Sequence, residues 1–183
     1  KLTGRFATHP GLNPSTLYFD LTRRAWWPDM LDALGIDADR LPDLLEPFEP
    51  AGRLRAAAAA DTGLPAGIPV CGAPIDQVAG AVGAGNLNAG LVTETTGAAL
   101  ALAATLDQPL YDPQKRAGLY LHALPNRYVL LPWAPTAGMA LRWFRDALAE
   151  GATYESLTAE AEQTPPGADD VRFLPHLCGA GSP

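Results

Sequence analysis

Apolar and polar residues alternate near the start of the chain, and helical spacing follows. Leu17, Phe19 and Leu21 alternate with polar neighbours, which is typical of a half-buried strand, and residues 1–20 as a whole are expected to be extended. Apolar positions three or four residues apart, with prolines at helix starts and glycines at helix ends, predict the helices. The predicted helices cover 28–34, 39–45, 53–62, 74–84, 137–150 and 154–163. The predicted strands cover 68–72, 91–96, 98–105, 119–123, 128–131 and 173–175.

This mixture of strands and helices favours an α/β fold. The pattern changes at the connector Gly85-Asn-Leu-Asn-Ala-Gly90, where a helix ends and a strand meander begins. We therefore place a domain boundary there, which gives domains 1–89 and 90–183. The alanines in 91–105 leave a helix open as an alternative to the two strands around Gly97.

Composition and charge exclude several classes of partner. The net charge is −7 and no basic run occurs, which argues against nucleic acid or an anionic membrane surface. No apolar run approaches the ~18 residues that a membrane-spanning helix needs. Two distant cysteines, Cys71 and Cys178, make no metal-binding spacing, and we expect the reducing cytoplasm as the compartment.

Asp76 is the first candidate for chemistry, because it is the only acid in the apolar run Gly67–Gly85. An acid in such a run costs free energy unless it has a partner or a task. Its place at a predicted helix N-terminus is also explained by an ordinary helix cap, which local features favour. Both interpretations stay open at this point. The small residues in 79–84 would let a ligand or a second backbone come close.

Two further stretches are weaker candidates. Thr93-Glu-Thr-Thr-Gly-Ala-Ala99 places hydroxyls beside a glycine, which can cradle phosphate, although local features favour an ordinary hairpin turn. Trp133-Ala-Pro-Thr-Ala-Gly-Met-Ala140 enters a helix, and helix entries attract anions. The three histidines show no metal-ligand spacing, so we expect structural or surface roles for them and no metal held by protein ligands: His9, His122 and His176.

Several motifs in this order resemble the FGGY family of carbohydrate kinases over nearly the whole chain. The most specific part is Thr62-Gly-Leu-Pro-Ala-Gly-Ile-Pro-Val70, followed by Gly72 and Asp76. Thr96-Gly-Ala-Ala99 stands where the family usually has Gly-Thr-Ser. The other matching pieces are Asn13-Pro-Ser-Thr16, Phe19-Asp20, Trp27, Leu31 to Ile36, Leu41-Pro42, Ala137-Gly138 with Trp143 to Asp146, and Phe173-Leu-Pro175 with Gly179 and Pro183.

The resemblance implies an actin-like, ribonuclease H-like fold of two domains with a cleft between them, seen here as a fragment that spans the domain junction. Residues 1–89 would be the end of the sugar-binding N-terminal domain. Residues 90–183 would be the beginning of the ATP-binding C-terminal domain. On this basis the 183 residues alone are expected to be inactive, because half of the cleft is missing.

The resemblance also implies ATP-dependent phosphorylation of a sugar hydroxyl, with Mg²⁺ as cofactor and a pentulose such as xylulose as the default acceptor. Asp76 would be the general base and would bind the sugar together with Gln77. The protein would be a cytoplasmic enzyme whose partners are a small sugar and ATP, and a homodimer is left open. The expected nucleotide contacts are Thr96, Gly97, Ala98, Gly138 and Arg142.

Two departures from the family pattern keep other hypotheses open. Ala98 replaces the usual phosphate-loop threonine, which removes a hydroxyl, and Ala180-Gly181 stands where Glu-Arg is usual. The second hypothesis is therefore a non-catalytic relative that binds a sugar or a nucleotide. The third is a different actin-like ATPase or an unrelated α/β protein.

Overall fold

The computed structural model describes residues 1–46 and 48–179. These residues cluster into two compact units. Unit 1 comprises 1–93 and 103–131, and unit 2 comprises 94–102 and the described residues from 132 onward. These compact units are not the same thing as the two domains of the family, so the domains 1–89 and 90–183 stay a prediction.

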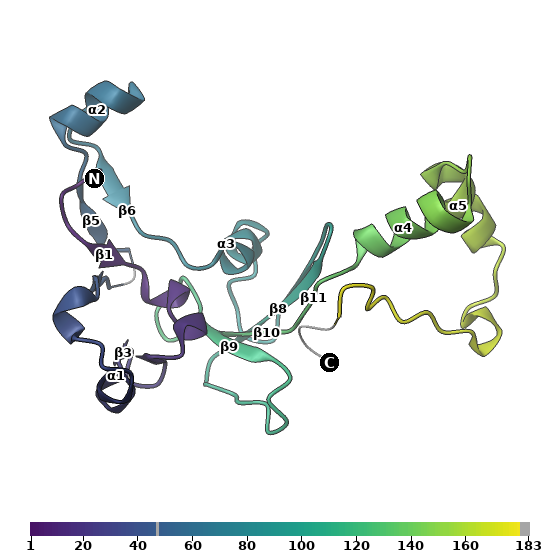
Figure 1. The fold of residues 1–183 in the computed structure, drawn as a ribbon, viewed down its shortest axis with the longest axis horizontal. Helices are drawn as coiled ribbons and strands as arrows, with labels where there is room; N and C mark the ends of the chain where they lie inside the picture. Colours follow the sequence, from purple (N-terminus) through teal and green to yellow (C-terminus); the bar gives the residue numbers. More distant parts are fainter. Residues whose placement is uncertain (47, 180–183) are drawn as a thin grey trace. The chain divides into compact units, whose positions relative to one another are not determined.

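Short strand pairs organise the first half of unit 1 (Figure 1). β1 (Ala7–Thr8) runs parallel to β4 (Asp43–Leu44), although the paired residues Ala7 and Asp43 lie 36 positions apart in the chain. The two antiparallel pairs are β2 (Phe19–Asp20) with β3 (Ala25–Trp26) and β5 (Pro50–Arg53) with β6 (Pro69–Cys71). Short 3₁₀ turns lie at η1 (Pro10–Leu12), η2 (Pro14–Thr16) and η3 (Ala38–Arg40).

The helices of unit 1 end close to the predicted residues, but the second and third begin later than the predicted positions 53 and 74. Pro28 occupies the first position of α1 (Pro28–Leu34), and Gly35 ends it with a left-handed φ of 64°. α2 (Ala56–Thr62) ends at Gly63 in the same conformation. α3 (Asp76–Gly83) follows β6 after a four-residue segment.

Strands β7–β11 form one sheet, so the strand interpretation of 91–105 is confirmed over the helical alternative. Its order is β11 (Trp133–Ala134), β8 (Leu100–Leu106), β10 (Tyr128–Leu131) and β9 (Gly118–Leu121), and β7 (Val92–Thr96) also pairs with β8. The helical part of unit 2 consists of α4 (Gly138–Leu148), α5 (Tyr154–Glu162) and the 3₁₀ turn η4 (Ala168–Asp170). None of the described helices is both long and apolar enough to cross a membrane.

The core of unit 1 joins segments that are distant in sequence. Phe19, Leu21 and Leu121 form a buried cluster, which brings the β2 segment against the β9–β10 hairpin. Val78 of α3 and Val129 of β10 are fully buried. The burial of Val78 shows that α3 packs against the rest of the described protein through this side chain.

The connector after α3 is anchored by buried polar groups. The Asn86 side chain donates to the carbonyl of Ala103 (2.9 Å) and to the Thr93 hydroxyl (3.2 Å). His122 Nδ1 accepts the N–H of Leu124 at 2.9 Å, so its Nε2 must carry the proton that is donated to the Asn86 carbonyl at 3.0 Å. Burial lowers the pKa of His122, which is consistent with this neutral ring.

Several sequence predictions of local structure are wrong. Residues 1–20 are not extended as a whole, because η1 and η2 interrupt them, and residue 53 lies in β5 rather than in a helix. Leu17 is exposed with a left-handed φ of 69°, so the predicted alternating strand is reduced to Phe19–Asp20. Residues 39–45 are a 3₁₀ turn and the strand β4 rather than a helix. Residues 173–175 form no strand, and Phe173 and Leu174 are exposed.

Candidate functional site

Asp76 is the first residue of α3 and not its N-cap. The N-cap position belongs to Ile75, whose side chain makes no capping hydrogen bond. The Oδ1 atom of Asp76 accepts the N–H of Gln77 at 3.0 Å. This contact partly satisfies the helix start, but the cap interpretation favoured by local sequence features is wrong in its strict form. Two residues of α3, Val78 and Ala81, are buried and hold the helix in place.

The face of α3 that carries Asp76 is open. Asp76 is exposed, so the free-energy cost of a buried acid does not arise. Its Oδ2 atom has no partner among the described residues. Ala79, Gly80 and Gly83 lie at helical spacing from Asp76, and a side chain added at either glycine would meet nothing within 4 Å. Packing therefore does not explain these small residues.

Gln77 lies next to this face and is half-buried. Its Oε1 atom is shielded from solvent, and no described group donates a hydrogen bond to it. A side-chain amide with an unsatisfied oxygen can reorient at little cost, because no existing hydrogen bond at that atom is broken.

In unit 2, the turn between β7 and β8 is joined to the start of α4 by backbone hydrogen bonds. The N–H of Ala137 donates to the carbonyl of Ala98 at 2.8 Å, and the N–H of Gly138 donates to the carbonyl of Gly97 at 3.0 Å. We call these two bonds the turn–helix clip. Because the clip uses the N–H groups at the helix entry, they are not available to an anion there.

The other side of the same turn offers unused donors. In the described part of the chain, the N–H groups of Ala98 and Ala99 donate to no other group. Successive free N–H groups in a turn form a concavity that suits a phosphate. The hydroxyl of Thr96 already donates to the Glu94 carboxylate, so its oxygen can only accept from a further partner.

Gly138 is required by the close approach of the two segments. A β-carbon at this position would lie 2.5 Å from the carbonyl oxygen of Gly97, a distance at which the backbone must shift. Arg142 follows one helical turn later, and within residues 1–46 and 48–179 its one ion pair is a long contact of 3.6 Å with Asp146. Its exposed guanidinium is therefore free to bind another anion.

The structure thus brings together four of the five predicted nucleotide contacts, namely Thr96, Gly97, Ala98 and Gly138, with Arg142 on the same helix as Gly138. The sequence analysis named the stretches that contain Ala99 and Ala137 but not these two residues as contacts, because they contribute only backbone groups and leave no side-chain signal. Asp76 and Gln77 belong to unit 1. The departure at Ala180-Gly181 lies outside the described residues.

The histidines have the structural or surface environment that we expected. His9 and His122 are buried, and His9 Nδ1 accepts the N–H of Gly11 at 3.0 Å. His176 is exposed. Among residues 1–46 and 48–179, no three His, Cys, Asp or Glu side chains gather in a way that could hold a metal ion.

Comparison with known proteins finds similar carbohydrate kinases, and some of these similarities extend over the whole chain. Residues 1–83 match the sequence profile of the FGGY family of carbohydrate kinases, N-terminal domain. Xylulose kinase of Escherichia coli (strain K12) is 31% identical over 183 residues, which are 100% of this chain and 37% of that protein. Autoinducer-2 kinase of Yersinia pestis (strain Pestoides F) is 32% identical over 180 residues, which cover 93% of this chain and 34% of that protein.

The solved structures agree with these relatives. Xylulose kinase from Rhodospirillum rubrum superposes with a TM-score of 0.89 at 30% sequence identity. The superposed region includes 100% of this chain and 38% of the Rhodospirillum rubrum chain. The chain spans a little over a third of the length of the relatives and structures that it matches. The predicted fold class is that of the actin-like sugar kinases. It is confirmed for the part of such a kinase that this chain represents.

Proposed function

Because this chain belongs to the FGGY family of carbohydrate kinases, we propose that the protein transfers the γ-phosphoryl group of ATP to a hydroxyl of a sugar. A pentulose such as xylulose is the first acceptor to test, since xylulose kinases are among the similar proteins. The observation that carries the proposal is the turn of residues 97–99, whose two unused N–H groups can hold a phosphate.

Asp76 is the proposed general base. Its Oδ2 atom would accept the proton of the sugar hydroxyl while the hydroxyl oxygen attacks the γ-phosphorus. The bond from the γ-phosphorus to the bridging oxygen then breaks, and ADP leaves with that oxygen. The exposed position, the uncommitted Oδ2 and the open face beside Gly80 and Gly83 support this role. Gln77 offers an amide to a second sugar hydroxyl from the adjacent position.

The nucleotide contacts follow from the turn–helix clip. The N–H groups of Ala98 and Ala99 would donate to phosphate oxygens, and Arg142 would add a positive charge one helical turn beyond the clip. Gly138 would contribute by position, since its N–H already bonds to Gly97. Mg²⁺ would be held mainly by the phosphate oxygens and by water and would neutralise phosphate charge, so that Asp76 keeps its Oδ2 atom for the proton.

A second candidate is a non-catalytic relative that binds sugar or nucleotide. The observation that favours it is Ala98, which has no hydroxyl to offer to the phosphates. In this case the clip and the open face of α3 would serve binding alone.

A coupled ADP-release assay on the full-length protein tests the proposal across pentuloses, hexuloses and polyols. Replacing Asp76 by Asn or Ala is expected to lower kcat by about 10²–10⁴-fold, the usual contribution of a general base. Asp61→Asn is the matched control, because Asp61 is an exposed acid on α2 and has no hydrogen-bond or ion-pair partner among the described residues.

The outcomes separate the hypotheses. Sugar-dependent ADP release that disappears in both Asp76 variants and persists in Asp61→Asn supports the kinase and its base. Full turnover in Asp76→Ala would contradict the proposed mechanism. Sugar binding without ADP release for any sugar would favour the non-catalytic relative.

A further inference from the structure

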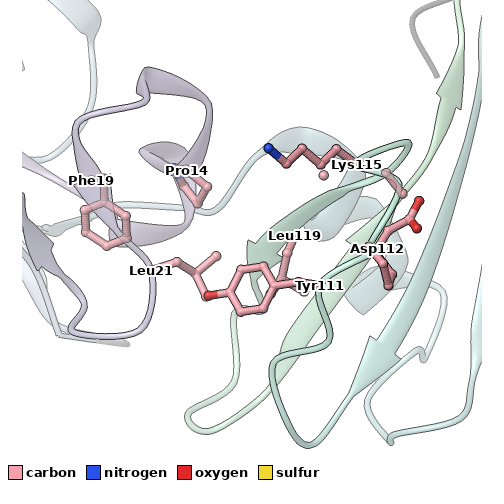
Figure 2. A pocket seen from close by; sticks show the side chains of 10 residues that line it. Pro14, Phe19, Leu21, Tyr111, Asp112, Lys115 and Leu119 are labelled. Atoms are coloured by element: carbon pink, nitrogen blue, oxygen red, sulfur yellow. The ribbon is translucent and has the colours of Figure 1, made fainter.

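Unit 1 contains a cavity that shares no residue with the candidate site. It lies between the segment 14–21 and the loop 111–119 and has a volume of about 530 Å³. Its walls are mainly apolar and are formed by Pro14, Phe19, Leu21, Pro113, Ala117 and Leu119 (Figure 2). The volume falls within the range of about 300–1,000 Å³ that is usual for small-molecule sites.

The loop along one side of the cavity is held in a defined conformation by Asp112. Its carboxylate accepts the N–H groups of Gln114 (3.0 Å) and Arg116 (2.9 Å) and forms an ion pair with the Arg116 guanidinium at 2.9 Å. The side-chain hydrogen bond from Arg116, followed by the backbone bond from Gln114, lowers the pKa of Asp112 to about 2. The hydroxyls of Tyr111 and Thr22 lie 3.0 Å apart in a hydrogen bond, which ties the loop to the opposite segment.

Among the described residues that line this cavity, Lys115 is the one whose charge is not matched by a partner. Its backbone has a left-handed φ of 57°, and its N–H donates to the Asp112 carbonyl at 2.9 Å. A residue with a β-carbon adopts this conformation at a cost in free energy, and such residues cluster at ligand clamps. The ammonium group has no ion pair or hydrogen bond within the described residues.

Figure 2 shows the direction of this side chain. It extends from the loop towards the segment with Pro14 and Phe19, and Lys115 is one of the residues that line the cavity. The neighbouring acids are already neutralised, since Asp112 pairs with Arg116 and Asp20 lies 3.6 Å from Arg23. The cavity therefore carries one uncompensated positive charge.

We propose that this cavity binds a small organic monoanion, a carboxylate with an aromatic or aliphatic body, whose carboxylate pairs with Lys115 while its body packs against Phe19 and Leu119. A single ammonium group matches a single negative charge. A phosphate dianion would leave a second negative charge close to Asp112, which makes it the poorer fit. Apolar walls with one placed polar group are the usual composition of such sites.

The probe for the test is 2-naphthoate, with neutral 2-naphthalenemethanol as its uncharged counterpart. Binding to the full-length protein is measured by equilibrium dialysis. Lys115→Gln is expected to weaken naphthoate binding about tenfold or more, the usual effect of removing a charged hydrogen bond. Lys115→Arg, which keeps the charge, and Arg40→Gln, which removes an exposed charge elsewhere, are expected to bind as the parent protein does.

A second measurement locates the probe. Reductive methylation with ¹³C-formaldehyde labels lysines, and the Lys115 signal is identified by its absence in Lys115→Arg. Saturable movement of this signal by naphthoate, with little movement by the alcohol, supports the site. Equal binding to Lys115→Gln and Arg40→Gln would overturn it, as would a Lys115 signal that does not move. Failure of Lys115 to react would also overturn it, because the cavity would then be filled by another part of the protein.

Discussion

Gly138 lies where there is no room for a side chain. Ala at this position would place a β-carbon 2.5 Å from the Gly97 carbonyl oxygen and would push the turn away from α4. We expect Gly138→Ala to destabilise the protein by about 1–3 kcal/mol. We also expect it to raise KM for ATP at least about tenfold, because the phosphate donors lose their alignment.

Thermal unfolding and kinase kinetics of the full-length protein measure both effects. Ala147→Gly, at an exposed position of the same helix, is the control, because it should weaken the helix without changing KM for ATP. An unchanged melting temperature in Gly138→Ala would show that the backbone accommodates the side chain without loss of the turn–helix clip.

Ala98 provides the second test at this scale. Restoring a hydroxyl with Ala98→Thr is expected to lower KM for ATP by about 2–10-fold, the value of one neutral hydrogen bond. Ala98→Val has nearly the same shape without the hydroxyl and is the matched control. If the two variants have the same KM, the turn binds phosphate through its backbone alone.

At the scale of elements, α3 has glycines on its exposed face, where packing does not require them. A glycine within a helix costs about 0.5–1 kcal/mol relative to alanine, and Gly80 has open space around it. We therefore expect Gly80→Ala to raise the free energy of unfolding by about that amount. If a substrate or another backbone approaches this face, kcat/KM is expected to fall at the same time.

Urea unfolding and the ADP-release assay, run on the same protein, separate these effects. A more stable variant with unchanged kcat/KM would mean that nothing approaches α3 at Gly80. The small residues would then need an explanation other than function.

The elements that sequence predicts well are those whose signals are local. Pro28 and Gly35 bound α1 by their own backbone preferences, and Gly63 ends α2 in the same way. The strand β4 was mistaken for a helix because its structure depends on pairing with β1, which lies far away in the chain. Periodicity in 39–45 contains no information about such a partner.

The candidate site likewise has a part that sequence can predict and a part that depends on contacts between distant segments. Asp76 and the turn at Gly97 are marked by side chains and motifs, so sequence could propose them. The turn–helix clip consists of backbone atoms of Gly97, Ala98, Ala137 and Gly138, and only the structure brings these segments together. The free N–H of Ala99 could not be found from sequence for the same reason.

For the molecule as a whole, the buried histidines predict a loss of stability in acid. Burial lowers the pKa of His9 and of His122 in the folded state, whereas in the unfolded chain both are expected near 6.5. The unfolded state then binds more protons between the two values. Stability is fully present above about pH 7 and falls as pH decreases towards the lowered folded-state pKa, by up to about 1.4 kcal/mol per pH unit for each group.

Urea unfolding between pH 5.5 and 8 measures this slope on the full-length protein. His122→Gln is expected to flatten it, whereas the exposed His176→Gln should leave it unchanged. A slope that is identical in all three proteins would exclude the Asn86–His122 network as its source.

The turn–helix clip has one more consequence, for the exchange of amide protons with solvent. The amides of Ala137 and Gly138 are bonded and should exchange slowly, while those of Ala98 and Ala99, on the facing segment, should exchange fast. A bound triphosphate would slow the second pair and leave the first unchanged. Four backbone protons within the chain can therefore report nucleotide occupancy directly, without a label and without turnover.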